Sequence, residues 1–319
     1  MRMCRNLDCY VPETACSLGH RDHMMCTEIG QSSADSTSTL QLNSIDAMLL
    51  PWSGSALGLS DLAFISGRAR PVITAIIGPQ YAGKTTLLGA WYLLLGHGAT
   101  IDERDFAGSH SLAGWEAVSS SMRWTAGSRP TFPAHTTSRD GRAPGLLHLS
   151  FWHGKHDKAT DYLFTDAPGE WFGNWAIDRD ASAGARWIAD TADSFILVAD
   201  RQALSGERMG AARNELRQLA HRLASERDGR PVALVWTKSD FSVSPEVENA
   251  VRKTIFETMP DIKEFSVSVK LGEPGTDDAE RGLIALLEWT LAVRRPCPKL
   301  PPPASHGMDP MFLFGATAR

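Results

Sequence analysis

The sequence predicts an α/β protein with three layers, in which helices cover both faces of a mostly parallel sheet. Short β-branched runs alternate with helical stretches between residues 72 and 293, and this alternation is typical of parallel sheets. The 319 residues, 43% of them hydrophobic, are enough to bury a large core without disulfides. No apolar run approaches the length that spans a bilayer. We therefore expect a cytoplasmic protein without a membrane partner, and the formal net charge of -5 argues against nucleic acid as a partner.

The first 26 residues hold four of the five cysteines of the chain. Cytosolic thiols seldom persist as disulfides, whereas a structural zinc ion takes four Cys or His ligands. Residues 1–30 therefore predict a zinc-binding leader that uses four of five candidate ligands. The candidates are Cys4, Cys9, Cys16, His20 and Cys26. A disordered arm without metal is the alternative, because the spacing contains no C-x2-C pair.

Residues 31–66 predict a linker followed by a short apolar element. The linker, to about residue 44, is rich in Ser and Thr and poor in large apolar side chains. The main domain is expected over residues 67–295. Residues 296–319 are a Pro-rich tail with an apolar end, which predicts either a docking peptide or a strap on the chain's own domain.

The main domain begins with a β-branched run at residues 72–78, which leads into a predicted helix at residues 85–96. Residues 146–154 and 161–166 predict a hairpin that would add one antiparallel edge strand. Buried strands are then expected at residues 194–200, 231–237 and 264–269, and helices at residues 206–226 and 278–293.

A turn between the first strand and the first helix matches the pattern G-x-x-x-x-G-K-[ST] at residues 78–85. Its glycines let successive N–H groups face phosphates, and the helix N-terminus adds partial positive charge. Lys84 would reach the β- and γ-phosphates, and the Thr85 hydroxyl would ligate Mg²⁺. The predicted phosphate-binding residues are Gly78, Gln80, Tyr81, Ala82, Gly83, Lys84, Thr85 and Thr86. The alternative is a glycine-rich turn followed by a chance Lys-Thr.

Three later strand ends carry further candidates. Asp166-Ala167-Pro168-Gly169 follows one strand, where Asp166 would hold Mg²⁺ through water and the Gly169 N–H would contact a γ-phosphate. Thr237-Lys238-Ser239-Asp240 follows another, where the Lys238 stem would cover a base and Asp240 would accept the two N–H groups of guanine. Adenine lacks that donor pair, so the carboxylate selects against it.

The last strand ends in Ser268-Val269-Lys270, which would offer the Val269 amide to guanine O6. As alternatives, the Thr237–Asp240 run is a strand-end loop with a helix cap, and residues 268–270 are plain strand.

These four motifs, in this order and each at a strand end, resemble the first, third, fourth and fifth guanine-nucleotide motifs of the Ras-like (TRAFAC) GTPase superfamily. The resemblance covers residues 70–293. Together with the Cys-rich leader, the chain is similar to the bacterial double-GTPase proteins of prokaryotic conflict systems. The resemblance implies binding of GTP and GDP with Mg²⁺, slow hydrolysis, and switching toward protein partners, with a second GTPase as one candidate and antiviral defence as the setting. A GTP-bound scaffold without hydrolysis is the alternative function, and an ATP-using kinase is disfavoured by the Thr237–Asp240 run.

A Thr that closes over magnesium and the γ-phosphate is implied by the same resemblance, with Thr136 and Thr137 as candidates and Thr137 as our choice. Both lie some fifty residues beyond Thr85, so residues 97–129 would be an insertion. Residues 111–124 within it predict an amphipathic helix with Leu112, Trp115, Val118 and Met122 on one side. A surface loop without a magnesium role is the alternative.

Catalysis requires a group that orients the attacking water. Gln80 is our first candidate, because this position resembles the P-loop of dynamin-like proteins, and Glu170 is the second. Arg139 and Arg142 are candidates for a stabilising arginine, or plain surface charges. Trp171 and Trp175 follow Glu170 and predict either core packing or an interface that responds to the nucleotide.

Overall fold

The computed structural model describes residues 56–67, 69–133, 144–154, 156–270 and 277–296. All of them belong to the unit Leu49–Arg319. The predicted zinc ligands, Thr136 and Thr137, Arg139 and Arg142, and the tail beyond residue 296 lie outside the described residues.

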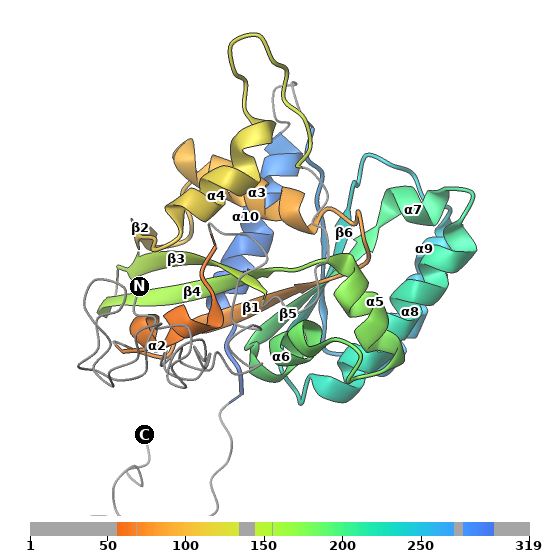
Figure 1. The fold of residues 1–319 in the computed structure, drawn as a ribbon. Coiled ribbons are helices and arrows are strands. Elements are labelled where there is room, and N and C mark those ends of the chain that lie inside the picture. Colours follow the sequence, from red (N-terminus) through yellow and green to blue (C-terminus); the bar gives the residue numbers. More distant parts are fainter. Residues whose placement is uncertain (1–55, 68, 134–143, 155, 271–276, 297–319) are drawn as a thin grey trace, which may run out of the picture. The chain divides into compact units, whose positions relative to one another are not determined.

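The described residues form a seven-stranded sheet in the order β2-β3-β4-β1-β5-β6-β7 (Figure 1). Strands β4, β1, β5, β6 and β7 pair in parallel, whereas β3 is antiparallel to both of its neighbours. The strands are β1 (Val72–Ile77), β2 (Arg104–Gly108), β3 (Gly145–His153), β4 (His156–Asp166), β5 (Ser194–Asp200), β6 (Val232–Thr237) and β7 (Lys263–Ser266). The predicted mixed α/β fold with a mostly parallel sheet is confirmed.

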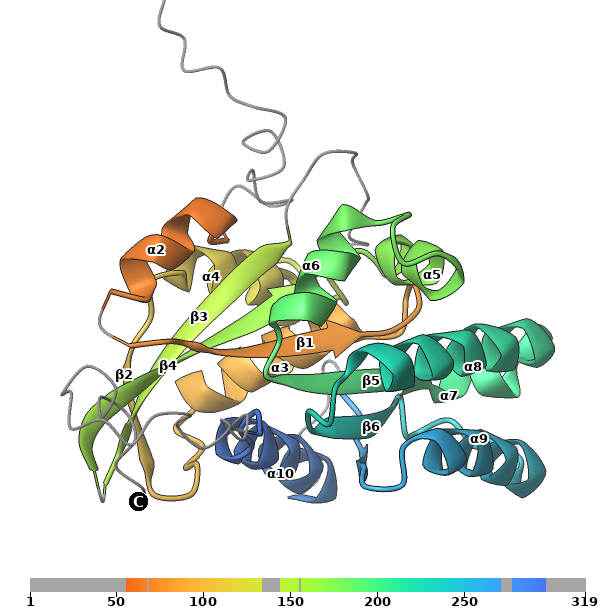
Figure 2. The same cartoon turned by 90° about the horizontal axis from the view of Figure 1, so that it is seen from below.

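Helices cover both faces of this sheet (Figure 2). Helices α2, α5, α6, α7, α8 and α9 contribute to the core on one face, and α3, α4 and α10 to the core on the other. The helices are α2 (Leu62–Ile65), α3 (Lys84–Gly96), α4 (Leu112–Ser119), α5 (Gly169–Ile177), α6 (Ala183–Thr191), α7 (Arg201–Ser205), α8 (Met209–Glu226), α9 (Pro245–Thr258) and α10 (Asp277–Ala292), with 3₁₀ turns η2 (Leu59–Asp61) and η3 (Ser120–Met122).

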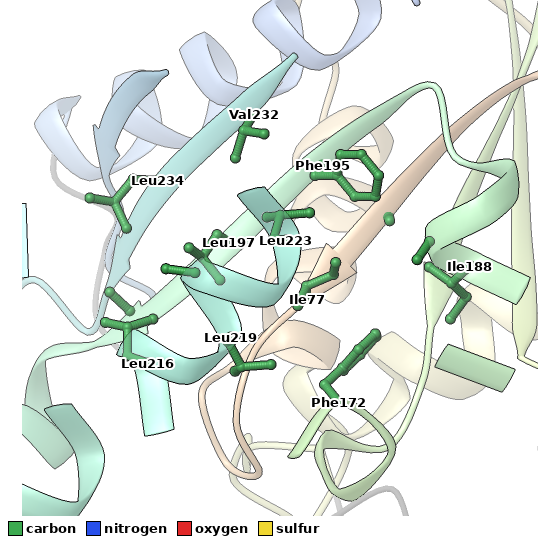
Figure 3. Close-up of a cluster of buried hydrophobic side chains, with 14 of the residues drawn as sticks. Ile77, Phe172, Ile188, Phe195, Leu197, Leu216, Leu219, Leu223, Val232 and Leu234 are labelled. Atoms are coloured by element: carbon green, nitrogen blue, oxygen red, sulfur yellow. The ribbon is translucent and has the colours of Figure 1, made fainter. Parts of the chain in front are cut away.

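The alternation of side chains along each strand produces the two cores. In β5, Phe195 and Leu197 belong to one core, and Ile196 and Val198 belong to the other. All seven residues of β5 are buried, which explains why its sequence is a continuous apolar run rather than an alternating one. Figure 3 shows the first of these cores, where side chains of β1, β5 and β6 meet those of α5, α6 and α8.

Capping residues define where several helices begin. The Ser182 hydroxyl accepts a hydrogen bond from Ala185 N at the start of α6. Asp200 accepts from Gln202 N and Ala203 N at the start of α7, directly after β5. Helix α9 has Ser244 as its cap and a proline in its first turn, where the missing N–H costs nothing.

The predicted hairpin is present as β3 and β4, paired antiparallel from Gly145 to His153. The strand β3 does not form the edge of the sheet, because β2 pairs with it and lies outside it. Strand β2 is short and largely exposed, and its sequence, Arg-Asp-Phe-Ala-Gly, has neither the apolar run nor the alternation from which strands are predicted.

Two other elements differ from the expected ones. The final strand ends at Ser266, so residues 268–270 lie in the loop beyond it. The run after Asp166, for which no helix is predicted from the sequence, forms helix α5 from Gly169. The helix expected over residues 111–124 is present as α4 and η3, with Trp115, Val118 and Met122 buried and Leu112 exposed.

Candidate functional site

The turn at residues 78–85 joins the end of β1 to the start of α3 (Figure 1). Tyr81 and Gly83 adopt left-handed backbone conformations, with φ of 61° and 89°. Positive φ at alternating positions turns neighbouring N–H groups to the same side, as anion-binding loops require. The Thr237 hydroxyl donates to the carbonyl oxygen of Ala82 at 2.8 Å, which ties this loop to the end of β6.

Lys84 is buried, and its ammonium group is held within the loop. Nζ donates to the carbonyl oxygens of Gly78, at 3.0 Å, and of Pro79, at 2.7 Å. Burial lowers the pKa of Lys84 to about 8, although the charges of Asp166, Glu215 and Glu170 oppose this shift. An anion that reaches the loop therefore meets a cation that is poorly solvated, and their attraction is strong.

Asp166 lies at the end of β4, and its Oδ1 accepts a hydrogen bond from the Thr85 hydroxyl at 3.0 Å. Burial raises the pKa of Asp166 to about 6, while the bond from Thr85 and the charge of Lys84 oppose the rise. Its second oxygen, Oδ2, is buried and receives no hydrogen bond from the described residues. A hydroxyl beside a carboxylate with an unused oxygen is a suitable donor set for Mg²⁺ or its water ligands.

Gly169 begins helix α5 in direct contact with the phosphate-loop backbone. A Cβ atom at Gly169 would lie 2.5 Å from the carbonyl carbon of Pro79 and 2.6 Å from Gln80 Cα. Gln80 and Glu170 meet at the same place, where Gln80 Nε2 donates to Glu170 Oε1 at 3.0 Å. The glycine is therefore required by the approach of the two backbones.

Side chains after β5, β6 and β7 meet at the opposite end of the site. Lys238 has a φ of 52°, and its Nζ contacts Asp200 Oδ2 at 2.7 Å and Gln202 Oε1 at 2.9 Å. The Ser268 hydroxyl donates to Asp240 Oδ1 at 2.7 Å, which fixes the direction of that exposed carboxylate.

A cavity of about 590 Å³ connects the two ends. It is lined by Gln80, Tyr81, Ala82, Gly83, Lys84, Thr85, Thr86, Leu87, Phe132, Pro133, Ala167, Gly169, Gln202, Thr237, Lys238, Asp240, Phe241, Val267 and Val269. Most of the residues predicted for phosphate and base are therefore brought to one hollow, although more than 150 residues separate Gln80 from Asp240 in the sequence.

Several predicted residues lie outside that lining. Gly78 is buried at the start of the loop, where a Cβ atom would come 2.9 Å from Val198 Cβ. Ser268 contacts the cavity through Asp240, and Lys270 is exposed beyond it. Asp166 and Glu170 border the phosphate end through Thr85 and Gln80.

Other residues at the site are not among those predicted from the sequence. Phe132 and Pro133 line the cavity, and Phe132 is 57% exposed. Glu215 of α8 is half-buried near Lys84, where burial raises its pKa and the charge of Lys84 opposes the rise. The proline-flanked Phe132 could have been noticed beside the expected magnesium Thr, but Glu215 lies within an ordinary amphipathic helix and has no local signal.

Trp171 and Trp175 lie on the buried side of α5, in the core, which agrees with the core-packing interpretation. The Trp171 ring lies against Gly184 of α6, where a Cβ atom would come 2.6 Å from its Cε3 atom. Gly184 thus provides the space that the indole occupies.

A larger cavity, of about 1050 Å³, lies between α3, α4 and β2. Its polar lining includes the Tyr92 hydroxyl, which donates to Glu116, itself paired with Arg123. We place the chemistry in the smaller cavity, because it is lined by the phosphate loop and the buried Lys84, and because the unsatisfied oxygen of Asp166 borders it through Thr85. Among the described residues there is no group of three His, Cys, Asp or Glu side chains placed to bind a metal, and no helix suited to cross a membrane.

Comparison with known proteins agrees with this geometry. No curated protein matches the chain. The family model described as Double-GTPase 2 matches residues 72–290, a span that begins with β1, contains the phosphate loop and both ends of the cavity, and closes within α10. The chain is therefore a P-loop GTPase of the double-GTPase type and belongs to the Double-GTPase 2 family.

Proposed function

We propose that the chain binds GTP with Mg²⁺, hydrolyses it to GDP and phosphate, and acts as a nucleotide-controlled switch toward protein partners. The observation that carries the proposal is one cavity with Lys84 and Thr85 at one end and Lys238 and Asp240 at the other. Triphosphate and base are the two ends of one ligand, and each end of the cavity offers matching groups.

The phosphate end would use charge and backbone N–H groups. The Lys84 ammonium would exchange the carbonyl oxygens of Gly78 and Pro79 for phosphate oxygens, which are stronger acceptors. Thr85 and Asp166 would hold Mg²⁺, which when bound neutralises charge on the β- and γ-phosphates. Thr137 remains our candidate for the residue that closes over that ion.

The base end would select guanine. Asp240 would accept from the N1–H and the exocyclic amine, while Ser268 keeps the carboxylate in place. The Val269 amide would donate to O6, and Lys238 would cover one face of the base with its aliphatic stem. Phe132 stands in the cavity wall as an exposed aromatic ring against which a nucleoside would pack.

Hydrolysis would depend on an oriented water, because phosphoryl transfer asks the protein mainly for positioning and neutralisation of charge. Gln80 is our candidate for that orienting group. It lines the cavity beside Lys84 and is held by Glu170.

The experiment combines nucleotide binding with phosphate release by the purified full-length chain. Tight GTP binding, weaker ATP binding and slow multiple-turnover phosphate release are expected. GTP binding without any release would favour the scaffold alternative, and equal affinity for ATP and GTP would contradict the assignment of Asp240.

Further parts of the proposal rest on the sequence. We propose that residues 1–30 bind one zinc ion through four of the five ligand candidates, that residues 31–66 form a linker and a short apolar element, and that residues 296–319 dock onto a protein. A second GTPase is the partner that the family suggests, in a bacterial conflict system. Elemental analysis of protein purified under reducing conditions tests the leader, and an absence of zinc would contradict it.

A further inference from the structure

We propose that Glu170 is a positioning residue that fixes the side-chain amide of Gln80, and that it does not itself take a proton from the attacking water. This inference rests on the proposed GTP hydrolysis. Its basis is the partly buried hydrogen bond of 3.0 Å from Gln80 Nε2 to Glu170 Oε1.

The hydrogen bond determines which way the amide of Gln80 points. An ionised carboxylate only accepts hydrogen bonds, so the NH₂ group of Gln80 must face Glu170. The amide oxygen of Gln80 must then face the opposite way. An oxygen with a fixed direction is the group needed to accept a proton of a water molecule and to aim its lone pair at phosphorus.

The backbone forces the two residues together. The close approach of Gly169 to Pro79 and Gln80 leaves no space for even a methyl group. On the other side of Glu170, the buried Trp171 ring is seated on Gly184 of α6. Glu170 lies between these two contacts in the first turn of α5, so its backbone is held beside Gln80 and only a rotation of its side chain can break the hydrogen bond.

The charges around Glu170 also favour a role in positioning Gln80 over a role in removing a proton from water. Burial lowers the pKa of the Lys84 ammonium group, and the charge of the nearby Glu170 carboxylate is one of those that oppose this shift. Because the γ-phosphate would bind the same ammonium group, a carboxylate acting as the base would have to face the triphosphate charge. Gln80 lines the cavity and Glu170 does not, so the neutral amide would face the phosphate while the carboxylate stays behind it.

The test compares Glu170→Gln, Glu170→Ala, Gln80→Ala and the double Ala variant in single-turnover GTP hydrolysis, with GTP affinity measured in parallel. The glutamine at 170 keeps a carbonyl acceptor for the Gln80 amide, so Glu170→Gln should retain most of the wild-type rate. Glu170→Ala should lower the rate roughly 10- to 100-fold with unchanged GTP affinity, because the water-orienting group loses its direction. Adding Glu170→Ala to Gln80→Ala should have no further effect, because Glu170 acts through Gln80.

A second measurement needs no turnover. In the nucleotide-free ¹⁵N-labelled protein, the Gln80 side-chain amide signals are identified by their loss in Gln80→Ala. Their exchange with solvent should be slow in the wild type and in Glu170→Gln, and fast in Glu170→Ala.

Several results would overturn the inference. Equal loss of rate in Glu170→Gln and Glu170→Ala would identify Glu170 as the base, and additive losses in the double variant would show that it acts independently. A loss of GTP affinity in Glu170→Ala at unchanged rate would make it a binding residue. A wild type that binds GTP without hydrolysing it would overturn the proposed hydrolysis and this role together, whereas wild-type turnover with equal rates in Glu170→Ala would overturn this role alone.

Discussion

The hydroxyl of Thr85 donates a 3.0 Å hydrogen bond to Oδ1 of Asp166, which joins the first turn of α3 to the last residue of β4. The two residues are 81 positions apart in the sequence. Because β1 and β4 are parallel neighbours, the loop after β1 and the end of β4 meet at the same edge of the sheet. Two oxygen donors suited to Mg²⁺ are thus prearranged by strand pairing.

Lys84→Ala should weaken binding of a fluorescent GTP analogue roughly 10- to 100-fold, since a hydrogen bond to a charged group is worth about 1.5–3 kcal/mol. The fold should persist, because Lys84 itself lines the cavity and water can take the place of its ammonium group against the carbonyl oxygens of Gly78 and Pro79. Lys253→Ala, on an exposed part of α9, is the matched control. Normal affinity in Lys84→Ala would show that the phosphates bind elsewhere.

Asp240→Asn should reduce the preference for GTP and favour xanthosine triphosphate, whose O2 acceptor matches an amide donor. Competition binding with GTP, ATP and xanthosine triphosphate measures this change. Ser268→Ala should cause a smaller loss of GTP affinity, about 1 kcal/mol, because it removes only the bond that orients Asp240. An unchanged nucleotide ranking in Asp240→Asn would move base recognition away from this residue.

Gly169→Ala should lower both thermal stability and GTP affinity, because the added methyl group would overlap the backbone of Pro79 and Gln80. Gly173→Ala, in the same helix, is the control. Its Cβ atom would come no closer than 3.9 Å to Glu215 Oε1, and alanine is favoured over glycine in a helix by about 1 kcal/mol. The midpoint of thermal unfolding should therefore fall in Gly169→Ala and rise in Gly173→Ala relative to the wild type. Equal midpoints in the two variants would contradict the close approach of Gly169 to the loop.

The affinity for Mg²⁺ and GTP should be highest between pH 6 and pH 8. Above pH 8 the free protein loses the Lys84 proton, since the pKa of this group is lowered to about 8, and the cation that attracts phosphate disappears. Below pH 6 Asp166 becomes protonated, since its pKa is raised to about 6, and metal-dependent binding should weaken. Titrations with GTP at a series of pH values measure the loss of affinity on both sides of this range.

Lys84→Arg provides the control for the upper limb. A guanidinium group keeps its charge at these pH values, so the loss above pH 8 should disappear even if the overall affinity is lower. Persistence of the alkaline loss in Lys84→Arg would assign it to another group.

Local sequence determines the phosphate loop and the strands that carry the site. Residues 78–85 determine the geometry of the phosphate loop by themselves. The φ angles that a glycine permits, and the point at which a helix begins, are local properties of the chain. The buried parallel strands are equally predictable from the sequence, since both of their faces are covered and their sequences are continuously apolar.

Tertiary structure alone decided which side chains meet. The pairing of Gln80 with Glu170, the approach of Glu215 to Lys84 and the place of β2 outside β3 join residues that are distant in sequence. No local pattern encodes these contacts, because they arise from strand order and from the space left by Gly169 and Gly184. The composition of the site is therefore readable from the sequence, whereas the direction of its polar groups is a property of the packed fold.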